Sequence, residues 1–384
     1  MSGRIVLYGA TGYIGGLTAR AMVAAGARPV LAGRDQGRLN ALAARLAQAA
    51  GGIELETTVA GIESPERLRR LLGAGDVLVS TAGPFMKVGR PAVAAAVDAG
   101  AVYLDSSGEP PFIRQVFEEF GPRAERTGAV LLTAFGYDYV PGNLAGALAL
   151  QAAGSAASRV RVGYFVRGNI RKGTSAGTRA SVAGVLLEPG YAFRGGRVMT
   201  ERTAAHVASF EVGGRRREAF SIGSSEHFAL PRLRPGTTAA NGAPARVPLT
   251  EVGVYLGWFG AATRLVHYLS ALAVPSGRLP ALRRALEQQA RRIQRSRAAP
   301  GEEEAIRSNV VAMAADARDR TLAVVHLTGG DPYSFTAPML SWAAGRAAAH
   351  GVQPAGALGP VEAFGLDSLE SACTDAGFHR ERSG

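Results

Sequence analysis

Three glycines spaced three residues apart, in the stretch VLYGATGYIGG at residues 6–16, constrain the fold more than any other feature of this sequence. They end an apolar, β-branched run, RIVLYG at residues 4–9, which is typical of a buried parallel strand. A helical pattern without proline follows over residues 13–25 and ends at Gly26. A strand, a glycine-rich turn and a helix in this order predict the first unit of a dinucleotide-binding sheet.

The pattern Gly9-x-x-Gly12-x-x-Gly15 predicts a separate role for each glycine. Gly9 permits a tight exit from the strand, Gly12 lets a phosphate approach the backbone, and Gly15 lets helix and strand pack closely. We expect the helix N-terminus to present free N–H groups to a pyrophosphate. The alternative is an ordinary turn in a chain with 50 glycines, but the position at the first strand-to-helix turn favours a dinucleotide.

A second apolar run, RPVLAG at residues 28–33, bears on which dinucleotide binds. An acidic residue at the end of this strand binds the ribose 2′-hydroxyl of NAD, whereas a cation binds the 2′-phosphate of NADP. Arg34 occupies this position, and a guanidinium can bind a phosphate bidentately. Asp35 has the opposite charge, but we expect it to cap the helix that starts near Gly37. The sequence therefore favours NADPH over NADH.

Three further segments that each begin with a strand and a turn complete the predicted doubly wound parallel sheet, at residues 76–85, 101–109 and 129–150. The carboxyl ends of such strands open toward the crevice where cofactors bind. The predicted cofactor-binding residues are Gly9, Thr11, Gly12, Tyr13, Ile14, Gly33, Arg34, Thr81, Ala82, Gly83, Pro84 and Ser106.

From residue 159 onward the strands are alternating and closely spaced, and turns as short as Gly213-Gly214 predict antiparallel pairing. We therefore expect a second α+β domain with a largely antiparallel sheet, one face of which is buried by substrate or in a homodimer. The predicted division is a Rossmann domain at 1–150, a substrate and dimerisation domain at 151–330, and a return segment at 331–384. The last residues, 378–384, are predicted to be disordered.

Composition limits the possible partners. The net charge is +12, but only two of the 43 basic residues are lysine, and the arginine clusters lack interleaved aromatics. We therefore expect no nucleic acid partner. No uncharged apolar run reaches the length of a spanning helix. The longest candidate, residues 260–277, keeps association of the protein with a membrane as an alternative. Cys373 is the only cysteine, so we expect no metal site and a cytoplasmic location.

Several segments together resemble the saccharopine dehydrogenase-like oxidoreductases, including the mycobacterial trans-acting enoyl reductases. The segments are GATGYIG, LAGRD, STAGPF, YLDSSGE, GYDYVPGNL, KGTSAGTRAS and GGDPYSFTAPML. The resemblance implies a Rossmann domain that is interrupted by a second α/β domain and an NADP-dependent oxidoreductase activity. Where relatives often read Gly-Phe-Asp-Ser-Val-Pro-Ser-Asp-Leu, residues 136–144 read GYDYVPGNL, which adds two phenols and removes a carboxylate.

The proton that accompanies hydride transfer needs a protein group near the substrate. No tyrosine is followed four residues later by lysine, so the Tyr-x-x-x-Lys pair that short-chain dehydrogenases use for this proton is absent from the sequence. The predicted catalytic residues are Tyr137, Tyr139, Lys172 and Asp138, and the other candidates are Lys87, Glu109 and His227. The alternatives are that the phenols pack on the nicotinamide, that Lys172 is a solvated charge, and that His227 is a buried polar residue.

The sequence thus predicts an NADPH-dependent oxidoreductase, either an imine reductase acting on a C=N bond or an enoyl reductase acting on a conjugated C=C bond. The substrate is expected to be a small or carrier-bound metabolite of secondary or lipid metabolism, because aromatic residues are frequent in the middle of the chain. A non-catalytic NADP(H)-binding sensor or scaffold protein is the alternative, since a fold does not determine a function.

Overall fold

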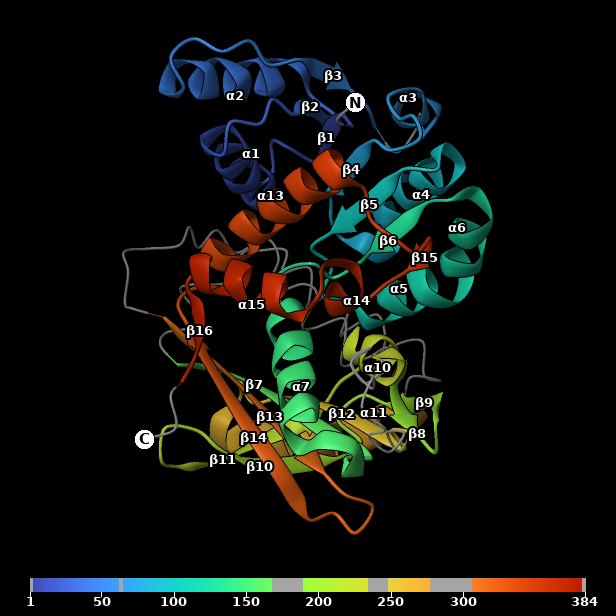
Figure 1. Ribbon diagram of the computed structural model, residues 1–384, viewed down its shortest axis with the longest axis vertical. Helices are drawn as coiled ribbons and strands as arrows, with labels where there is room; N and C mark the ends of the chain where they lie inside the picture. Colours follow the sequence, from blue (N-terminus) through green and yellow to red (C-terminus); the bar gives the residue numbers. More distant parts are fainter. Residues whose placement is uncertain (1–2, 62–64, 168–188, 234–247, 277–305, 382–384) are drawn as a thin grey trace, which may run out of the picture. The chain divides into compact units, whose positions relative to one another are not determined.

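The computed structural model describes residues 3–61, 65–167, 189–233, 248–276 and 306–381 (Figure 1). The chain divides into two compact units. Unit 1 comprises Met1–Val140 and Pro332–Ala376, and unit 2 comprises Pro141–Asp331 and Gly377–Gly384. Unit 1 therefore ends before the expected boundary at residue 150, and residues 377–384 of the expected return segment, 331–384, belong to unit 2.

Unit 1 contains a parallel seven-stranded sheet in the order β15-β6-β5-β4-β1-β2-β3, which is the Rossmann order with one added edge strand. Three of its four-residue strands are buried throughout, because helices cover both faces of such a sheet. The strands are β1 Ile5–Tyr8, β2 Val30–Gly33, β3 Thr57–Val59, β4 Val77–Ser80, β5 Val102–Asp105, β6 Val130–Leu132 and β15 Gly356–Ala357.

The helices of unit 1 come from both ends of the chain. Helix α13, Pro332–His350, lies along α1, Tyr13–Ala24, and contacts β4 and β5 (Figure 1). Alanines on α13, including Ala343 and Ala344, are fully buried, so the helices can approach closely. The other helices are α2 Gln36–Ala49, α3 Pro65–Arg70, α4 Phe85–Ala99, α5 Pro110–Gln115, the π-helix η1 Val116–Phe120, α6 Gly121–Thr127, α14 Pro360–Phe364 and α15 Leu366–Asp375.

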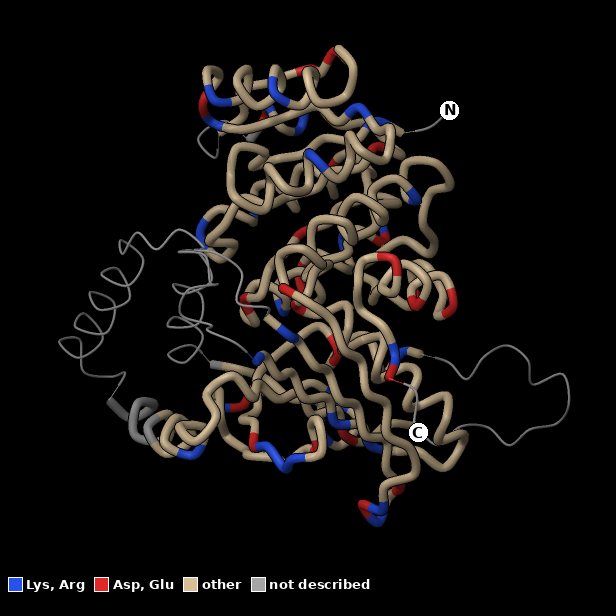
Figure 2. Tube along the Cα trace, turned by 90° about the vertical axis from the view of Figure 1, so that its left-hand side faces the viewer, with Lys and Arg blue, Asp and Glu red and all other residues tan. Residues whose placement is uncertain are grey.

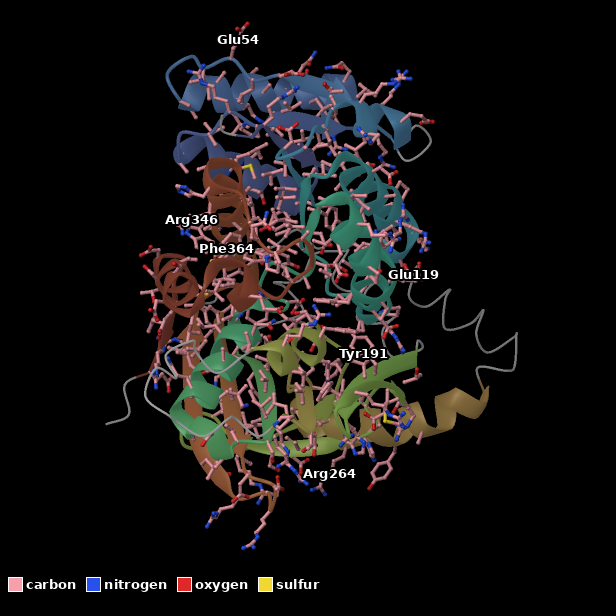
Figure 3. The ribbon with its side chains drawn as sticks, turned by 45° about the vertical axis from the view of Figure 1, so that its right-hand side comes forward. Glu54, Glu119, Tyr191, Arg264, Arg346 and Phe364 are labelled. Carbon is pink, nitrogen blue, oxygen red and sulfur yellow. The ribbon has the colours of Figure 1, made fainter. Side chains whose placement is uncertain are left out.

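The core of unit 1 continues into its C-terminal helices. Phe364, which is labelled in Figure 3, packs edge-on against Phe135 with 5.6 Å between ring centroids. The same ring lies 4.8 Å from that of Trp342 on α13. Residues more than two hundred positions apart thus share one aromatic cluster, which joins the two sequence segments of unit 1.

Unit 2 contains a nine-stranded sheet in the order β10-β11-β12-β7-β13-β14-β16, with β8 paired to both β12 and β9. Among the described residues, all its strand pairs are antiparallel except that of β7 with β12. The strands are β7 Arg159–Arg167, β8 Pro189–Arg194, β9 Arg197–Arg202, β10 Val207–Glu211, β11 Arg216–Ser221, β12 Glu251–Leu256, β13 Arg307–Ala315, β14 Thr321–Gly329 and β16 Phe378–Arg380. The two sheets confirm the predicted fold class.

One face of this sheet carries a buried apolar cluster that includes Phe165, Phe210, Ala219 and Tyr255. The rings of Phe165 and Phe210 are 5.6 Å apart and nearly perpendicular. The helices that accompany the sheet are α7 Val140–Ala153, η2 Gly154–Ala156, α10 Glu226–Ala229, η3 Leu230–Arg232, η5 Gly260–Ala262 and α11 Thr263–Ser276. Among the residues that the structure describes, no helix combines the length and the hydrophobicity that crossing a membrane requires.

Two features of unit 2 differ from expectation. The predicted disorder of residues 378–384 is wrong for Phe378–Arg380, which form β16 and pair with β14. The ring of Phe378 covers Gly329, where a Cβ atom would leave it no room. The hairpin of β8 and β9 was not expected; it turns at Gly195 and Gly196, both with positive φ.

Candidate functional site

The glycine loop of unit 1 lies between β1 and α1. Gly9 has a φ of +82°, and a Cβ atom there would lie 2.8 Å from the Ala82 nitrogen. A Cβ atom on Gly15 would run into the Gly9 carbonyl oxygen. Gly12 is the N-cap of α1 and supplies no side-chain cap. At its N-cap, Gly12, α1 therefore carries no side chain, which leaves the backbone open to a nucleotide phosphate.

Two arginines lie at the carboxyl end of β2. Arg34 follows the strand directly and is exposed. Arg38 lies in the first turn of α2, and its Nη2 donates to the carbonyl oxygen of Thr11 at 3.0 Å. Asp35 is the N-cap of α2, since its Oδ1 accepts the Arg38 N–H at 3.0 Å, as predicted. In the part of the chain that the structure describes, no carboxylate forms an ion pair with either arginine.

The turn after β4 is tied to the glycine loop. The Thr81 N–H donates to the Tyr8 carbonyl at 2.9 Å, and its hydroxyl lies within hydrogen-bond distance of the Tyr8 and Gly9 carbonyls. Gly83 is exposed, while Thr81, Ala82 and Pro84 are half-buried. The predicted cofactor residues of two different strands are thus held next to each other.

Glu109 is a buried carboxylate that caps α4. Its Oε1 accepts the Phe85 N–H at 2.8 Å, and its Oε2 accepts the Met86 N–H at 3.0 Å. Negative charge at a helix N-terminus is favourable, because the first N–H groups have no partner within the helix. Glu109 therefore braces the turn after β4 from the turn after β5, and this role accounts for both of its oxygens.

Asp105, the last residue of β5, connects the next two turns. It is fully buried, and its Oδ1 accepts the N–H groups of Ser107 at 2.8 Å and Ala134 at 2.9 Å. Its carbonyl oxygen accepts the Phe135 N–H at 2.6 Å. Burial raises the pKa of Asp105 to about 6, although the N–H groups of Ala134 and Ser107 oppose the shift. Ser106, a predicted cofactor residue, lies half-buried between these contacts.

The turn that carries three of the predicted catalytic residues follows β6. The Tyr137 N–H donates to the Thr336 hydroxyl on α13 at 3.0 Å, and the Tyr139 N–H donates to the Ala134 carbonyl at 2.7 Å. Both tyrosine side chains are buried. Asp138 lies between them, half-buried against Gly108, and desolvation by burial raises its pKa to about 6.

Of the remaining sequence candidates, Lys172 lies outside the described residues. Lys87 is exposed on α4. His227 belongs to unit 2 and is 1% exposed, and its Nδ1 accepts the Ser224 N–H at 3.2 Å. Burial lowers its pKa to about 4, so the ring is neutral near pH 7.

Unit 2 holds a buried polar cluster that sequence reasoning missed. The Tyr164 hydroxyl donates to Oε1 of Glu226 at 2.6 Å, and the Asn143 amide donates to the Ser225 hydroxyl at 3.0 Å. Tyr191, labelled in Figure 3, donates from its hydroxyl to the Ser224 carbonyl at 3.2 Å. No motif links these residues, because they come from α7, β7, β8 and the segment around α10, far apart in the sequence.

Thr336 and Tyr333 of α13 were also missed as parts of the unit 1 site. The ring of Tyr333 meets the ring of Tyr13 edge-on, with 5.3 Å between centroids. The GGDPYSFTAPML segment was noticed for its resemblance, but nothing in it indicated a contact with residues near the N-terminus.

Comparisons with known proteins agree with this geometry. Residues 5–132 match the family model described as the saccharopine dehydrogenase NADP binding domain. The apo, histidine-tagged saccharopine dehydrogenase (L-Glu forming) of Saccharomyces cerevisiae aligns over 100% of both chains, with a TM-score of 0.56 and 12% identity. At that identity the likeness concerns the fold alone.

Curated relatives match part of the chain. A Mycobacterium tuberculosis protein, whose name gives trans-acting enoyl reductase as a provisional assignment, is 38% identical over 185 residues, which are 47% of this chain and 44% of the relative. The trans-acting enoyl reductase of Mycobacterium leprae is 39% identical over 142 residues, 36% of this chain and 34% of the relative. The chain thus spans less than half the length of the curated relatives it matches.

Proposed function

Because this chain belongs to the saccharopine dehydrogenase-like NADP-binding oxidoreductases, we propose that it is an NADPH-dependent reductase of a conjugated C=C bond in a small or carrier-bound metabolite. The name enoyl reductase, borne by relatives that are 37–39% identical over the matched segments, favours this bond over a C=N bond. The observation that carries the proposal is a chain of hydrogen bonds, through Thr81, Glu109 and Asp105, that connects the glycine loop to the three turns following β4, β5 and β6.

We assign the 2′-phosphate to Arg34 and Arg38. The guanidinium of Arg38 is held by the Thr11 carbonyl, so it lies between the end of β2 and the glycine loop. A guanidinium has five N–H donors, which leaves most of those on Arg38 for a ligand. The N-terminus of α1 at Gly12 would take the pyrophosphate, and the turns at Thr81–Pro84 and Ser106 would line the ribose and nicotinamide.

Bound NADPH supplies the hydride for the reduction. The chain must orient the unsaturated carbon and manage one proton, which in enoyl reduction goes to the α carbon or to the enolate oxygen. Tyr137, Asp138 and Tyr139 are the residues we propose for this task. Their turn is fixed by Asp105 and Thr336, so a phenol or carboxyl group there has a defined position.

Cofactor binding is the first test. In calorimetric titrations, Arg34→Ala and Arg38→Ala should each weaken NADPH by about tenfold or more, the effect of losing hydrogen bonds to a charged group, and leave NADH unchanged. Arg45→Ala, which removes an exposed arginine from the same helix, is the matched control. Equal weakening of both cofactors by the Arg34 and Arg38 variants would show that the 2′-phosphate is held elsewhere.

Turnover is the second test. Enoyl thioesters and cyclic imines, offered with NADPH, separate the two bond types by the loss of NADPH absorbance. Tyr137→Phe and Tyr139→Phe should still bind NADPH, and at least one should lose turnover. Full turnover in both would remove the phenols from the mechanism. Binding of NADPH without turnover of any substrate would support the sensor or scaffold alternative. The homodimer and the cytoplasmic location remain predictions that these experiments do not test.

A further inference from the structure

The β10–β11 hairpin of unit 2 carries a run of three arginines, residues 215–217. Figure 2 colours every described Lys and Arg of the chain blue. Successive residues of a strand point to opposite faces of the sheet. Arg217 is the cross-strand partner of Phe210, which belongs to the buried apolar cluster, so Arg217 lies on that face. Arg216 is the partner of Glu211 and lies on the other face.

The face that carries Arg216 has its charges balanced. Glu218, two residues along β11, accepts hydrogen bonds from Arg264 at 2.6 and 2.9 Å. Arg264 is labelled in Figure 3. The Arg264 guanidinium lowers the pKa of Glu218. Glu211 lies directly across from Arg216, so each arginine on this face has a carboxylate on a neighbouring position.

The opposite face collects arginines without acids. Arg167, at the end of β7, donates from Nη2 to the Val212 carbonyl at 2.7 Å, so its guanidinium lies over the hairpin turn at Gly213. Burial, and then the positive charges of Arg167 and Arg215, lower the pKa of Arg217. In the described part of the chain, none of these three arginines has a carboxylate partner, and the buried Nε atoms of Arg167 and Arg217 have no hydrogen-bond acceptor.

Such a cluster is electrostatically unfavourable by itself. Like charges a few ångströms apart repel, and half-burial of Arg167 and Arg217 weakens the screening by water. An anion placed among the guanidinium groups would replace this repulsion by attraction, which the weak screening would strengthen. It would also supply acceptors for the two Nε–H groups. A phosphate monoester carries about −1.5 to −2 charges near neutral pH and three acceptor oxygens, so it balances more of this charge than a single carboxylate does.

We propose that Arg167, Arg215 and Arg217 form a binding site for the phosphate group of a small soluble molecule. The site lies wholly within unit 2 and uses none of the residues assigned to NADPH. Arg307, which pairs in register with Arg167 on β13, adds a further positive charge on the same face. The proposal is therefore independent of the proposed reductase activity.

Inorganic phosphate is the probe. The whole chain with the Arg34→Ala substitution, which removes an arginine that we assign to the 2′-phosphate of NADPH, is titrated with phosphate against chloride at equal ionic strength. Phosphate should raise the thermal unfolding midpoint and slow amide hydrogen exchange in residues 207–221. Adding Arg217→Gln should weaken phosphate by about tenfold, the loss expected for hydrogen bonds to a charged group.

Arg216→Gln, on the balanced face of the same strand, is the matched control and should leave phosphate binding unchanged. Arg167→Gln provides a second test if Arg217→Gln fails to fold. Equal losses in the Arg216 and Arg217 variants, or no response to phosphate beyond that to chloride, would overturn the site. Arg217-dependent binding to vesicles containing phosphatidic acid without any response to inorganic phosphate would overturn it in favour of a membrane surface.

Discussion

The two units bury polar side chains in different ways. In unit 1, the buried carboxylates Asp105 and Glu109 accept backbone N–H groups from turns that follow other strands. In unit 2, two buried hydrogen bonds instead join side chain to side chain, Tyr164 with Glu226 and Asn143 with Ser225. A carboxylate that receives N–H groups fixes the path of the backbone, whereas a side-chain pair fixes only the packing of two elements.

This difference fits the different ligands that we propose for the two units. A dinucleotide is bound largely by backbone groups, so the turns of unit 1 need exact positions, which the two carboxylates supply. A substrate is recognised by side chains. The pairs of unit 2 can therefore be exchanged between related proteins without moving the backbone, and the following predictions test that contrast in order of expected effect.

Asp105→Ala should be the most damaging change. It leaves the N–H groups of Ser107 and Ala134 without their acceptor, at about 1–3 kcal/mol for each buried group. Urea unfolding measures the loss, and hydrogen exchange should show both turns, 106–109 and 133–139, opening together. Asp105→Asn retains an oxygen at this position and should lose much less; equal effects of the two variants would contradict the role as an acceptor.

Tyr164→Phe should have a smaller and more local effect. Removing one donor from the Glu226 carboxyl group should cost about 1–3 kcal/mol, because the site is buried. Hydrogen exchange should increase around α10 and leave the turns of unit 1 unchanged. The control is Tyr191→Phe, whose hydroxyl donates to a backbone carbonyl at 3.2 Å and should be worth less. Faster hydrogen exchange in the unit 1 turns of Tyr164→Phe would contradict the difference between the two units.

The pH dependence should have opposite signs in the two units. The pKa of His227 is lowered from 6.5 to about 4, so the unfolded chain binds the proton first and stability falls as pH drops from 6.5 toward 4. The pKa of Asp105 is raised from 3.8 to about 6, so its contribution to stability is largest below pH 4 and is lost as pH rises through 6.

Two variants that replace the titrating group by a neutral amide separate these contributions. His227→Asn keeps an acceptor for the Ser224 N–H without titrating, and its stability relative to the original protein should rise by about 1 kcal/mol between pH 6.5 and 5.5. Asp105→Asn should show the reverse, with its relative stability falling as pH drops from 6 to 4. Parallel pH profiles for the two variants, measured by urea unfolding, would show that burial does not set these pKa values.

Local sequence patterns were enough to predict much of unit 1. The spacing of Gly9, Gly12 and Gly15, the position of Arg34 and the capping role of Asp35 all depend on residues within one strand, turn and helix. The contacts that hold the turn after β6, which we propose to be catalytic, could not be predicted, because Thr336 lies about two hundred residues from Tyr137 in the chain. In unit 2, the alternation predicted most strands but not the hairpin of β8 and β9, nor the pairing of β16 at the edge of the sheet.

The sequence by itself determined the fold class, the nucleotide loop and the preference for NADPH, since periodicity, glycine spacing and the charge after β2 act over a few residues. Only the tertiary structure decided that Asp105 joins two turns, that Glu226 lies against Tyr164, and that Arg167 meets Arg217 on one face of a sheet. These contacts depend on strand register and long-range packing, which bring together side chains that no local pattern relates.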